Sequence, residues 1–278
     1  MTTRSFIGIF VCVAFVLACS NKNNKKVGKT ELSKEDSLKI DDFKQKAYRQ
    51  NLFSQEYHKY LDSALQINPN NAYLWQQKAM PCFKSKKYEI GMTYLDKAVE
   101  YDPENYLEYR AFIKCIFSKQ YTEAIIDFNK AKELYGDSYI MDHSYDFFLG
   151  LSNLQLNNFN AANLYFKGSI QREIDKNGES WVHHLDWFYL GISEFELNNY
   201  DNAIIAFDKV LESYNDFSDA QYYKVICLAR LGKLEEAREL LLIGEKNSLL
   251  GKTINDSNSK YETYPYQVVP EQFERIIY

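Results

Sequence analysis

Two short motifs in the chain could bind phosphate. Gly28-Lys29-Thr30 and Gly251-Lys252-Thr253 match the end of a phosphate-binding loop, in which backbone amides cradle the phosphates and the lysine contacts them. Such a loop also needs a glycine five residues before its final Gly-Lys pair and a strand that leads into it. Neither copy has these features, so we expect no nucleotide site.

Histidines and carboxylates are the other candidates for chemistry. His183 and His184 precede Asp186, but adjacent helical residues point about 100° apart, and no further ligand set is evident. His58 and His143 are isolated in the sequence. No Ser/His/Asp motif, HExxH motif or paired-carboxylate context stands out. We therefore expect no metal site, no catalytic residues, no cofactor and no small-molecule substrate, so the protein is not expected to be an enzyme.

The cysteines do not indicate a disulfide framework. Three of the five, Cys82, Cys115 and Cys227, lie beyond the first twenty residues, an odd and widely separated set without a CxxC or Cys/His metal spacing. Each falls on a helix-like apolar stretch. We expect buried free thiols that behave as small hydrophobic groups.

The composition of the 278 residues favours helices. There are 23 Tyr and 18 Phe but only 11 Gly and 5 Pro, which argues against a β-rich fold with many tight turns and against disorder. So many aromatic rings need packing surface, and long helices with bulky seams supply it. The formal net charge of −5 gives no electrostatic footprint for nucleic acid, which we do not expect as a partner.

The first residues have the pattern of an export signal. Arg4 is the only charge before Lys22, and the apolar run over residues 6–18 is too short to span a bilayer but fits a secretory signal. The run ends in Val16-Leu17-Ala18-Cys19, which resembles the lipobox of bacterial lipoproteins. A plain secretory signal with an incidental cysteine, or an uncleaved anchor, is the alternative.

The lipobox resemblance implies a lipid anchor. The signal peptide, residues 1–18, would be removed, and Cys19 would carry a diacylglycerol on its thiol and a fatty acyl chain such as palmitate on its new amine. Residues 19–37 are polar and lack aromatic rings, which predicts a flexible tether. Ser20 does not provide the acidic signal for inner-membrane retention, so the expected location is the outer membrane of a bacterial cell envelope.

The remainder of the chain repeats itself. Residues 72–105 and the segment from His184 onward carry the same residue types at the same positions. The matched pairs are Trp75 and Trp187, Ala79 and Gly191, Tyr88 and Tyr200, Gly91 and Ala203, and Leu95 and Phe207. This pattern resembles the tetratricopeptide repeat, a helix-turn-helix unit of 34 residues.

The pattern recurs through most of the chain. The residues at position 24 of successive units are Leu61, Leu95, Phe128, Phe166, Phe207 and Leu241, spaced by 34, 33, 38, 41 and 34 residues. We therefore predict an all-α fold over residues 38–250, a superhelical solenoid of about six helix-turn-helix repeats. The extra residues fall in 134–143 and 171–183, where we expect longer loops or extended helix ends.

The resemblance also implies a binding surface, because this repeat family lines its concave face mainly with residues of the first helix of each unit. The partner-binding residues predicted on this basis are Lys46, Arg49, Gln76, Lys84, Tyr109, Phe147, Phe188, Ile192, Phe195 and Tyr222. Such a surface would be basic near the tether and apolar further along. An exposed apolar patch of this size indicates a binding site, but longer loops or the C-terminal tail could equally bury these rings.

The tail, residues 251–278, departs from the repeat pattern. It contains two prolines and the apolar or aromatic residues Tyr261, Tyr264, Tyr266, Val268, Val269, Phe273, Ile276, Ile277 and Tyr278. So much apolar surface predicts that the tail packs back, over the last repeat or as an extended strand on the concave face. The alternative is that the tail is itself a docking peptide.

These features predict a membrane-anchored interaction scaffold or adaptor. A peptide or protein partner would bind on the concave surface of the repeats, and the N-terminal lipid would hold the protein at the membrane. Two alternatives are an immunity or inhibitor protein for a secreted toxin, and an envelope assembly factor.

Overall fold

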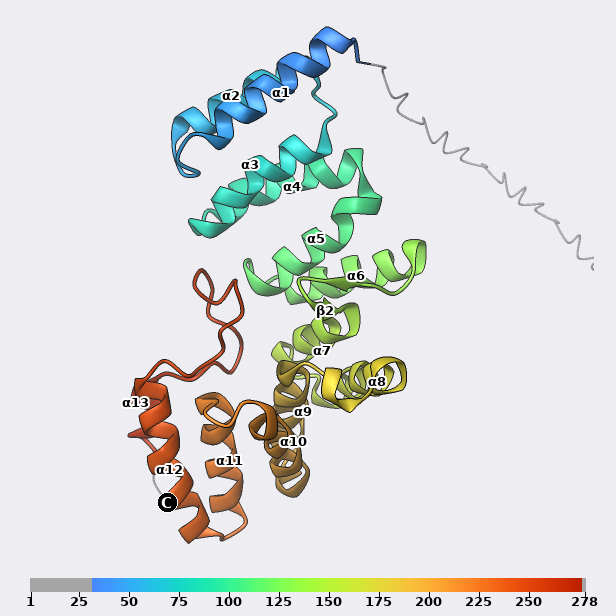
Figure 1. The fold of residues 1–278 in the computed structure, drawn as a ribbon. Helices are drawn as coiled ribbons and strands as arrows, with labels where there is room; N and C mark the ends of the chain where they lie inside the picture. The colour runs from blue at the N-terminus through green and yellow to red at the C-terminus, as the bar shows by residue number, and fades with distance from the viewer. Residues whose placement is uncertain (1–31, 277–278) are drawn as a thin grey trace, which may run out of the picture.

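The computed structural model describes residues 32–276. Within them, twelve long helices follow one another as six helix-turn-helix pairs (Figure 1). The pairs are α1 (Lys34–Tyr48) with α2 (Gln55–Ile67), α3 (Ala72–Lys84) with α4 (Tyr88–Tyr101), α5 (Pro103–Ile116) with α6 (Tyr121–Tyr135), α7 (Tyr145–Gln155) with α8 (Phe159–Asn177), α9 (His184–Glu196) with α10 (Tyr200–Ser213), and α11 (Ser218–Arg230) with α12 (Leu234–Leu249). The predicted all-α solenoid is confirmed.

The described residues include only a small part of the N-terminal region for which predictions were made. The signal peptide, Cys19 and most of the tether lie outside the described residues. The predicted tether over 19–37 is too long at its C-terminal end, because α1 begins at Lys34 and Ser33 caps it by accepting a hydrogen bond from the Asp36 amide. None of the helices in the described range is both long and apolar enough to cross a membrane.

The turns inside the pairs confirm the phase of the repeat. From the second pair onward, each turn places one residue in the left-handed backbone region, two positions before the second helix begins. These residues are Lys86, Lys119, Asn157, Asn198 and Gly232, with φ of 61°, 56°, 60°, 60° and 76°. A left-handed residue ends one helix and redirects the chain into the next.

Small residues let the two helices of a pair approach closely. A Cβ atom at Gly191 would lie 2.5 Å from Cε1 of Phe207, and one at Gly150 would lie 2.8 Å from Cε1 of Phe166. These are the small and the bulky positions of the repeat pattern, at its eighth and twenty-fourth places. The pattern therefore reports a contact in which a ring on one helix fills the space above a glycine on its partner.

A buried ion cluster ties α5 to α6. Asp127, which is 4% exposed, accepts two parallel hydrogen bonds of 2.8 Å from Nε and Nη2 of Arg110, and one of 2.7 Å from Nζ of Lys114. Arg110 also donates to Asp96 of α4 at 2.8 Å. A bidentate arginine pair in a buried setting fixes the relative position of the helices that carry it.

The inner layer of the solenoid is formed by the odd-numbered helices. From α3 to α11, each odd-numbered helix contacts the next one, while each even-numbered helix packs between its partner and the first helix of the following pair. The C-terminal tail runs back from α12 toward α3 and α5 along this layer, as the red segment of Figure 1 shows. It contributes Ile254, Tyr264, Val268 and Phe273 to the main hydrophobic core, each 2% exposed.

The two insertions take different forms. The first makes a hairpin of β1 (Tyr139–Ile140) and β2 (His143–Ser144), with Met141 and Asp142 in the left-handed region at φ of 48° and 67°, the type of turn that two-residue hairpins require. No strand was expected here from the sequence. The second insertion lengthens α8 and adds a short 3₁₀ helix, η1 (Glu179–Trp181).

The three described cysteines are buried and free, as predicted. Burial raises the pKa of the Cys115 thiol to about 11 and that of the Cys227 thiol to about 12, so both stay protonated and unreactive near neutral pH.

Candidate functional site

The predicted binding residues fall into three groups. Lys46 on α1 and Arg49 directly after it are exposed, and Gln76, Lys84, Tyr109, Phe195 and Tyr222 are half-buried on later helices. Phe147, Phe188 and Ile192 are fully buried, with 0% exposure. These last three cannot contact a partner while the protein keeps this structure.

The buried group corrects the expectation of an open apolar surface. The ring of Phe188 packs edge-on against Tyr189 and Phe217, with centroids 5.0 and 5.4 Å away. The ring of Phe147 stacks on His143 at 3.9 Å. The hairpin therefore covers Phe147 through His143, as expected if inserted loops bury these rings. Phe188 is covered instead by Tyr189 of its own helix and by Phe217, directly before α11.

The tail covers part of the inner layer, and side chains of the repeats hold it there by hydrogen bonds to its main chain. The Tyr189 hydroxyl, which is buried in α9, donates to the Pro265 carbonyl at 3.0 Å. Nζ of Lys119, in the turn between α5 and α6, donates to the Thr263 carbonyl at 3.0 Å. Both contacts recognise main chain, so they do not depend on the tail's side chains.

Asp219 at the start of α11 anchors two points of the tail. Its Oδ2 accepts from the Ile254 amide at 3.0 Å, and its Oδ1 accepts from the Val268 amide at 2.7 Å. The residue has 0% exposure. Burial raises the pKa of Asp219 to about 6, and hydrogen bonds that include those from Val268 and Ile254 offset only part of this effect.

Side chains complete the attachment of the tail. The Tyr266 hydroxyl donates to Oε1 of Glu196 on α9 at 2.7 Å, and the hydroxyl of Tyr88 on α4 donates to Glu262. At the end of the chain, α13 (Pro270–Phe273) places Phe273 edge-on against Tyr222, with ring centroids 5.1 Å apart. The tail thus contacts elements from the second pair of helices to the sixth.

The N-terminal end of the inner layer has a different character. Lys46 pairs with Asp42 one turn away at 2.6 Å, and both side chains are largely exposed. The hydroxyls of Tyr48 on α1 and Tyr73 on α3 lie 2.5 Å apart, and both side chains remain exposed, at 42% and 41%. Lys84 marks the boundary with the tail, because its Nζ lies 5.0 Å from the ring centroid of Tyr261.

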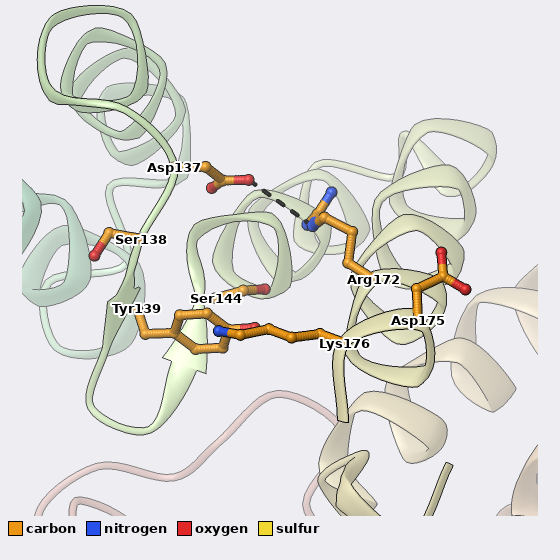
Figure 2. A pocket seen from close by; sticks show the side chains of 7 residues that line it. All are labelled: Asp137, Ser138, Tyr139, Ser144, Arg172, Asp175 and Lys176. Atoms are coloured by element: carbon orange, nitrogen blue, oxygen red, sulfur yellow. Dashed lines mark ion pairs between the residues drawn. The ribbon is translucent and has the colours of Figure 1, made fainter. Parts of the chain in front are cut away.

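The hairpin and α8 border an open pocket of about 380 Å³ (Figure 2). Its lining residues are Asp137, Ser138, Tyr139, Ser144, Arg172, Asp175 and Lys176. Lys176 reaches across the Tyr139 ring, with Nζ 5.7 Å from the centroid, and Nη2 of Arg172 pairs with Oδ2 of Asp146 at 2.5 Å. Nε of Arg172 also lies 3.9 Å from Oδ2 of Asp137 on the opposite wall, so the charge of Arg172 is already paired.

A group that sequence reasoning missed lies beside this pocket. His143 on β2, His183 and Asp186 are brought together so that one ligand atom from each lies within 4.8 Å of the others. Burial lowers the pKa of His183 to about 4 and that of His184 also to about 4. The only sequence signal was that His143 and His183 border the two insertions into the repeat pattern.

Comparison with known proteins identifies the repeat. Family models for the tetratricopeptide repeat match residues 72–105 and residues 187–247. The first range is the unit recognised from the sequence, and the second begins at Trp187 within the other. No curated protein matches the chain.

Solved structures share the fold at low sequence identity. PilW, described as a widely conserved type IV pilus biogenesis factor, aligns with a TM-score of 0.59 at 15% identity, over 76% of this chain and 92% of its own. A tetratricopeptide repeat protein from Parabacteroides merdae gives 0.58 at 16%, over 77% and 87%. YrrB, described as a TPR protein with an unusual peptide-binding site, gives 0.50 at 21%, over 67% and 91%. At these identities the likeness shows the fold alone.

Proposed function

We propose that this solenoid of tetratricopeptide repeats is a lipid-anchored interaction scaffold of a bacterial cell envelope, which binds an extended segment of a protein partner along its inner layer. The observation that carries the proposal is the way in which the chain holds its own tail. Tyr189, Lys119 and Asp219 recognise carbonyl and amide groups of residues 254–268.

This mode of contact suits peptide recognition in general. Main-chain hydrogen bonds supply affinity that is independent of sequence, and pockets for individual side chains then supply specificity. Phe273 against Tyr222 and Tyr266 on Glu196 are such side-chain contacts within the molecule. A partner segment with aromatic residues at a similar spacing would use the same surface.

The partner's first contact is proposed at the N-terminal end, which the tail leaves uncovered. Lys46 and Arg49 are exposed there, and the Tyr48 and Tyr73 rings offer apolar area beside them. Aromatic and arginine side chains are the residue types that dominate binding energy at interfaces. Lys46 already pairs with Asp42, so Arg49 is the group at this end that favours a partner segment carrying Asp or Glu.

A pull-down from the envelope fraction of the source bacterium tests the binding proposal. The bait is the full chain, compared with a Lys46→Glu/Arg49→Glu variant and with Lys130→Glu, an exposed charge reversal on α6, as the control. We expect the partner to be retained by the wild type and the control, and lost by the double variant. The same partners on all three baits would contradict binding at this end.

The membrane part of the proposal depends on Cys19. Several acyl chains, at roughly 0.8 kcal/mol for each buried CH₂, hold a folded domain at a bilayer essentially permanently. Expression in a bacterium fed a labelled palmitate analogue should give labelled protein in the membrane fraction, and Cys19→Ala should abolish both the label and the membrane association. Labelling that persists in Cys19→Ala would refute a lipid at this residue.

A further inference from the structure

Three segments outside the repeat pattern meet at one place. The hairpin brings His143, the segment after η1 brings His183, and the tail brings Asp256, while Asp186 comes from the first turn of α9. In an array built from repeated helix pairs, these segments are the ones whose conformation the repeat does not specify. Their convergence on two imidazoles and two carboxylates requires an explanation of its own.

His143 is the most unusual member of the group. Its side chain is 2% exposed, and neither ring nitrogen has a hydrogen-bond partner among residues 32–276. Nδ1 lies 3.9 Å from Oδ2 of Asp186, and Nε2 lies 3.8 Å from Oδ2 of Asp256. Leaving buried nitrogens unsatisfied costs free energy, and such groups in a folded protein point to an ion or water that completes them.

Asp186 is already oriented for a ligand role. Its Oδ1 accepts a hydrogen bond of 2.8 Å from the hydroxyl of Ser169, which in turn lies 2.8 Å from the hydroxyl of Ser144. The other oxygen, Oδ2, is the one that lies toward His143. Carboxylates that bind metals are themselves held by hydrogen bonds from outer groups, as Oδ1 of Asp186 is by Ser169.

We propose that His143, His183 and Asp186 form a binding site for one Zn²⁺ ion. His143 would bind through Nδ1 and Asp186 through Oδ2, and Asp256 would accept the Nε2–H of His143 from the tail. A carboxylate behind a metal-bound imidazole fixes its tautomer and orientation. Two imidazoles with one carboxylate suit zinc and its neighbours among the transition metals, whereas Ca²⁺ and Mg²⁺ prefer oxygen ligands throughout.

Binding requires a small rearrangement at His183. Its Nδ1 now accepts a hydrogen bond from the Leu185 amide at 3.2 Å. If Nδ1 binds the ion, its lone pair is used by the metal. If Nε2 binds the ion, Nδ1 carries the proton. In both cases Nδ1 can no longer accept the hydrogen bond from the Leu185 amide. His184 is not part of the set, since its ring packs edge-on against Tyr214 and Phe217 at 5.5 Å.

There is room beside the ligands for the remaining coordination. Cavities of about 180 and 200 Å³ lie next to His143 and His183, one lined in part by Trp181 and Glu173 and the other by Asn255 and Asp256. Zinc with three protein ligands takes water or another ligand in its fourth position. The ion would join the hairpin to α9 and, through Asp256, hold the tail on the inner layer.

Zinc titration of the full chain, after removal of metals with a chelator and exchange into clean buffer, tests the site. We expect isothermal titration to give one Zn²⁺ per chain, and Co²⁺ to give a visible spectrum typical of four-coordination. His183→Gln and Asp186→Asn should each weaken binding by at least a hundredfold. Asp256→Asn should weaken it by about ten- to a hundredfold without changing the stoichiometry.

Two histidine variants serve as controls, with folding followed by circular dichroism. His58→Gln on α2 and His184→Gln beside the site should both bind Zn²⁺ like the wild type. His143→Gln should lose binding, and because this residue is buried, the more accessible His183→Gln carries the conclusion if His143→Gln does not fold. Absence of saturable binding by the wild type, or unchanged binding by His183→Gln and Asp186→Asn, would overturn the site.

Discussion

Gly191 lies under the ring of Phe207, so close that a Cβ atom there would stand 2.5 Å from Cε1. Gly191→Ala should destabilise the fold by about 1–3 kcal/mol, because the ring has no space to move between packed helices. Gly168→Ala on α8 is the control, since its added Cβ would meet no atom nearer than 3.8 Å, at Arg172. There the higher helix propensity of alanine should stabilise by about 0.5–1 kcal/mol. Urea unfolding of both variants measures the difference, and equal effects would contradict the contact.

The ion cluster between α5 and α6 leads to a second prediction. Asp127→Ala leaves Arg110 and Lys114, with side chains 18% and 13% exposed, without their shared partner. Removing one member of a buried ion pair typically costs about 3–5 kcal/mol. Asp41→Ala, which removes an exposed partner of Lys44, should change the unfolding free energy far less. Similar midpoints for the two variants in urea would show that the cluster contributes little.

Asp219 should give the tail a pH dependence. Its folded pKa of about 6 lies above the ordinary value of 3.8, so the folded state binds the proton more tightly than the unfolded state does. Its contribution to stability is therefore greatest at low pH, declines as pH rises from about 4 to 6, and is constant above. The wild-type unfolding free energy, minus that of Asp219→Asn, should fall by at most about 3 kcal/mol over this window. A difference that is flat or rises would reject the raised pKa.

Removing the tail tests whether it belongs to the fold. Deletion of residues 252–278 takes away Ile254, Tyr264, Val268 and Phe273 and uncovers what they pack on, so the melting temperature should fall and binding of a hydrophobic dye should rise. The control is the full chain with Glu271→Ala and Glu274→Ala, two exposed tail residues. An unchanged melting temperature after deletion would mean that the tail adds no stability.

Phe188 should behave as a core residue rather than a binding residue. Phe188→Ala empties a fully buried site and should cost about 3–5 kcal/mol, as large-to-small changes of phenylalanine do. Phe195, half-buried on the same helix, should cost clearly less when changed to alanine. Thermal unfolding of the two variants distinguishes them. Equal losses would show that Phe195 is as tightly packed as Phe188.

The repeat phase could be predicted because it rests on local pairs. Gly150 with Phe166 and Gly191 with Phe207 lie within single helix pairs, and their spacing in the sequence reflects their contact in space. The burial of Phe188 could not be predicted in the same way. Helical periodicity identifies a face, but whether neighbouring helices close over that face depends on the stacking of units.

The grouping of His143, His183 and Asp186 could not be predicted from the sequence for a related reason. His143 and Asp256 are more than a hundred residues apart, and each sits in a segment that the repeat does not specify. Adjacent residues His183 and His184 drew attention as a pair. Of the two, His183 has a ring nitrogen within 4.8 Å of ligand atoms of His143 and Asp186, while His184 lines the neighbouring cavity and packs on Phe217. The hairpin is what places His143 beside His183 and Asp186, and nothing in the sequence indicated a strand at Tyr139.

The hydrogen bond from Tyr189 to Pro265 means that any partner on this part of the inner layer meets a resident competitor. Because the tail is covalently joined to α12, its effective concentration is on the order of millimolar, whatever the concentration of the protein. A free peptide with equal intrinsic affinity would therefore occupy the site appreciably only near that concentration. Partners that first bind at Arg49 and then extend inward would compete with the tail on comparable terms, since their own second step is also intramolecular.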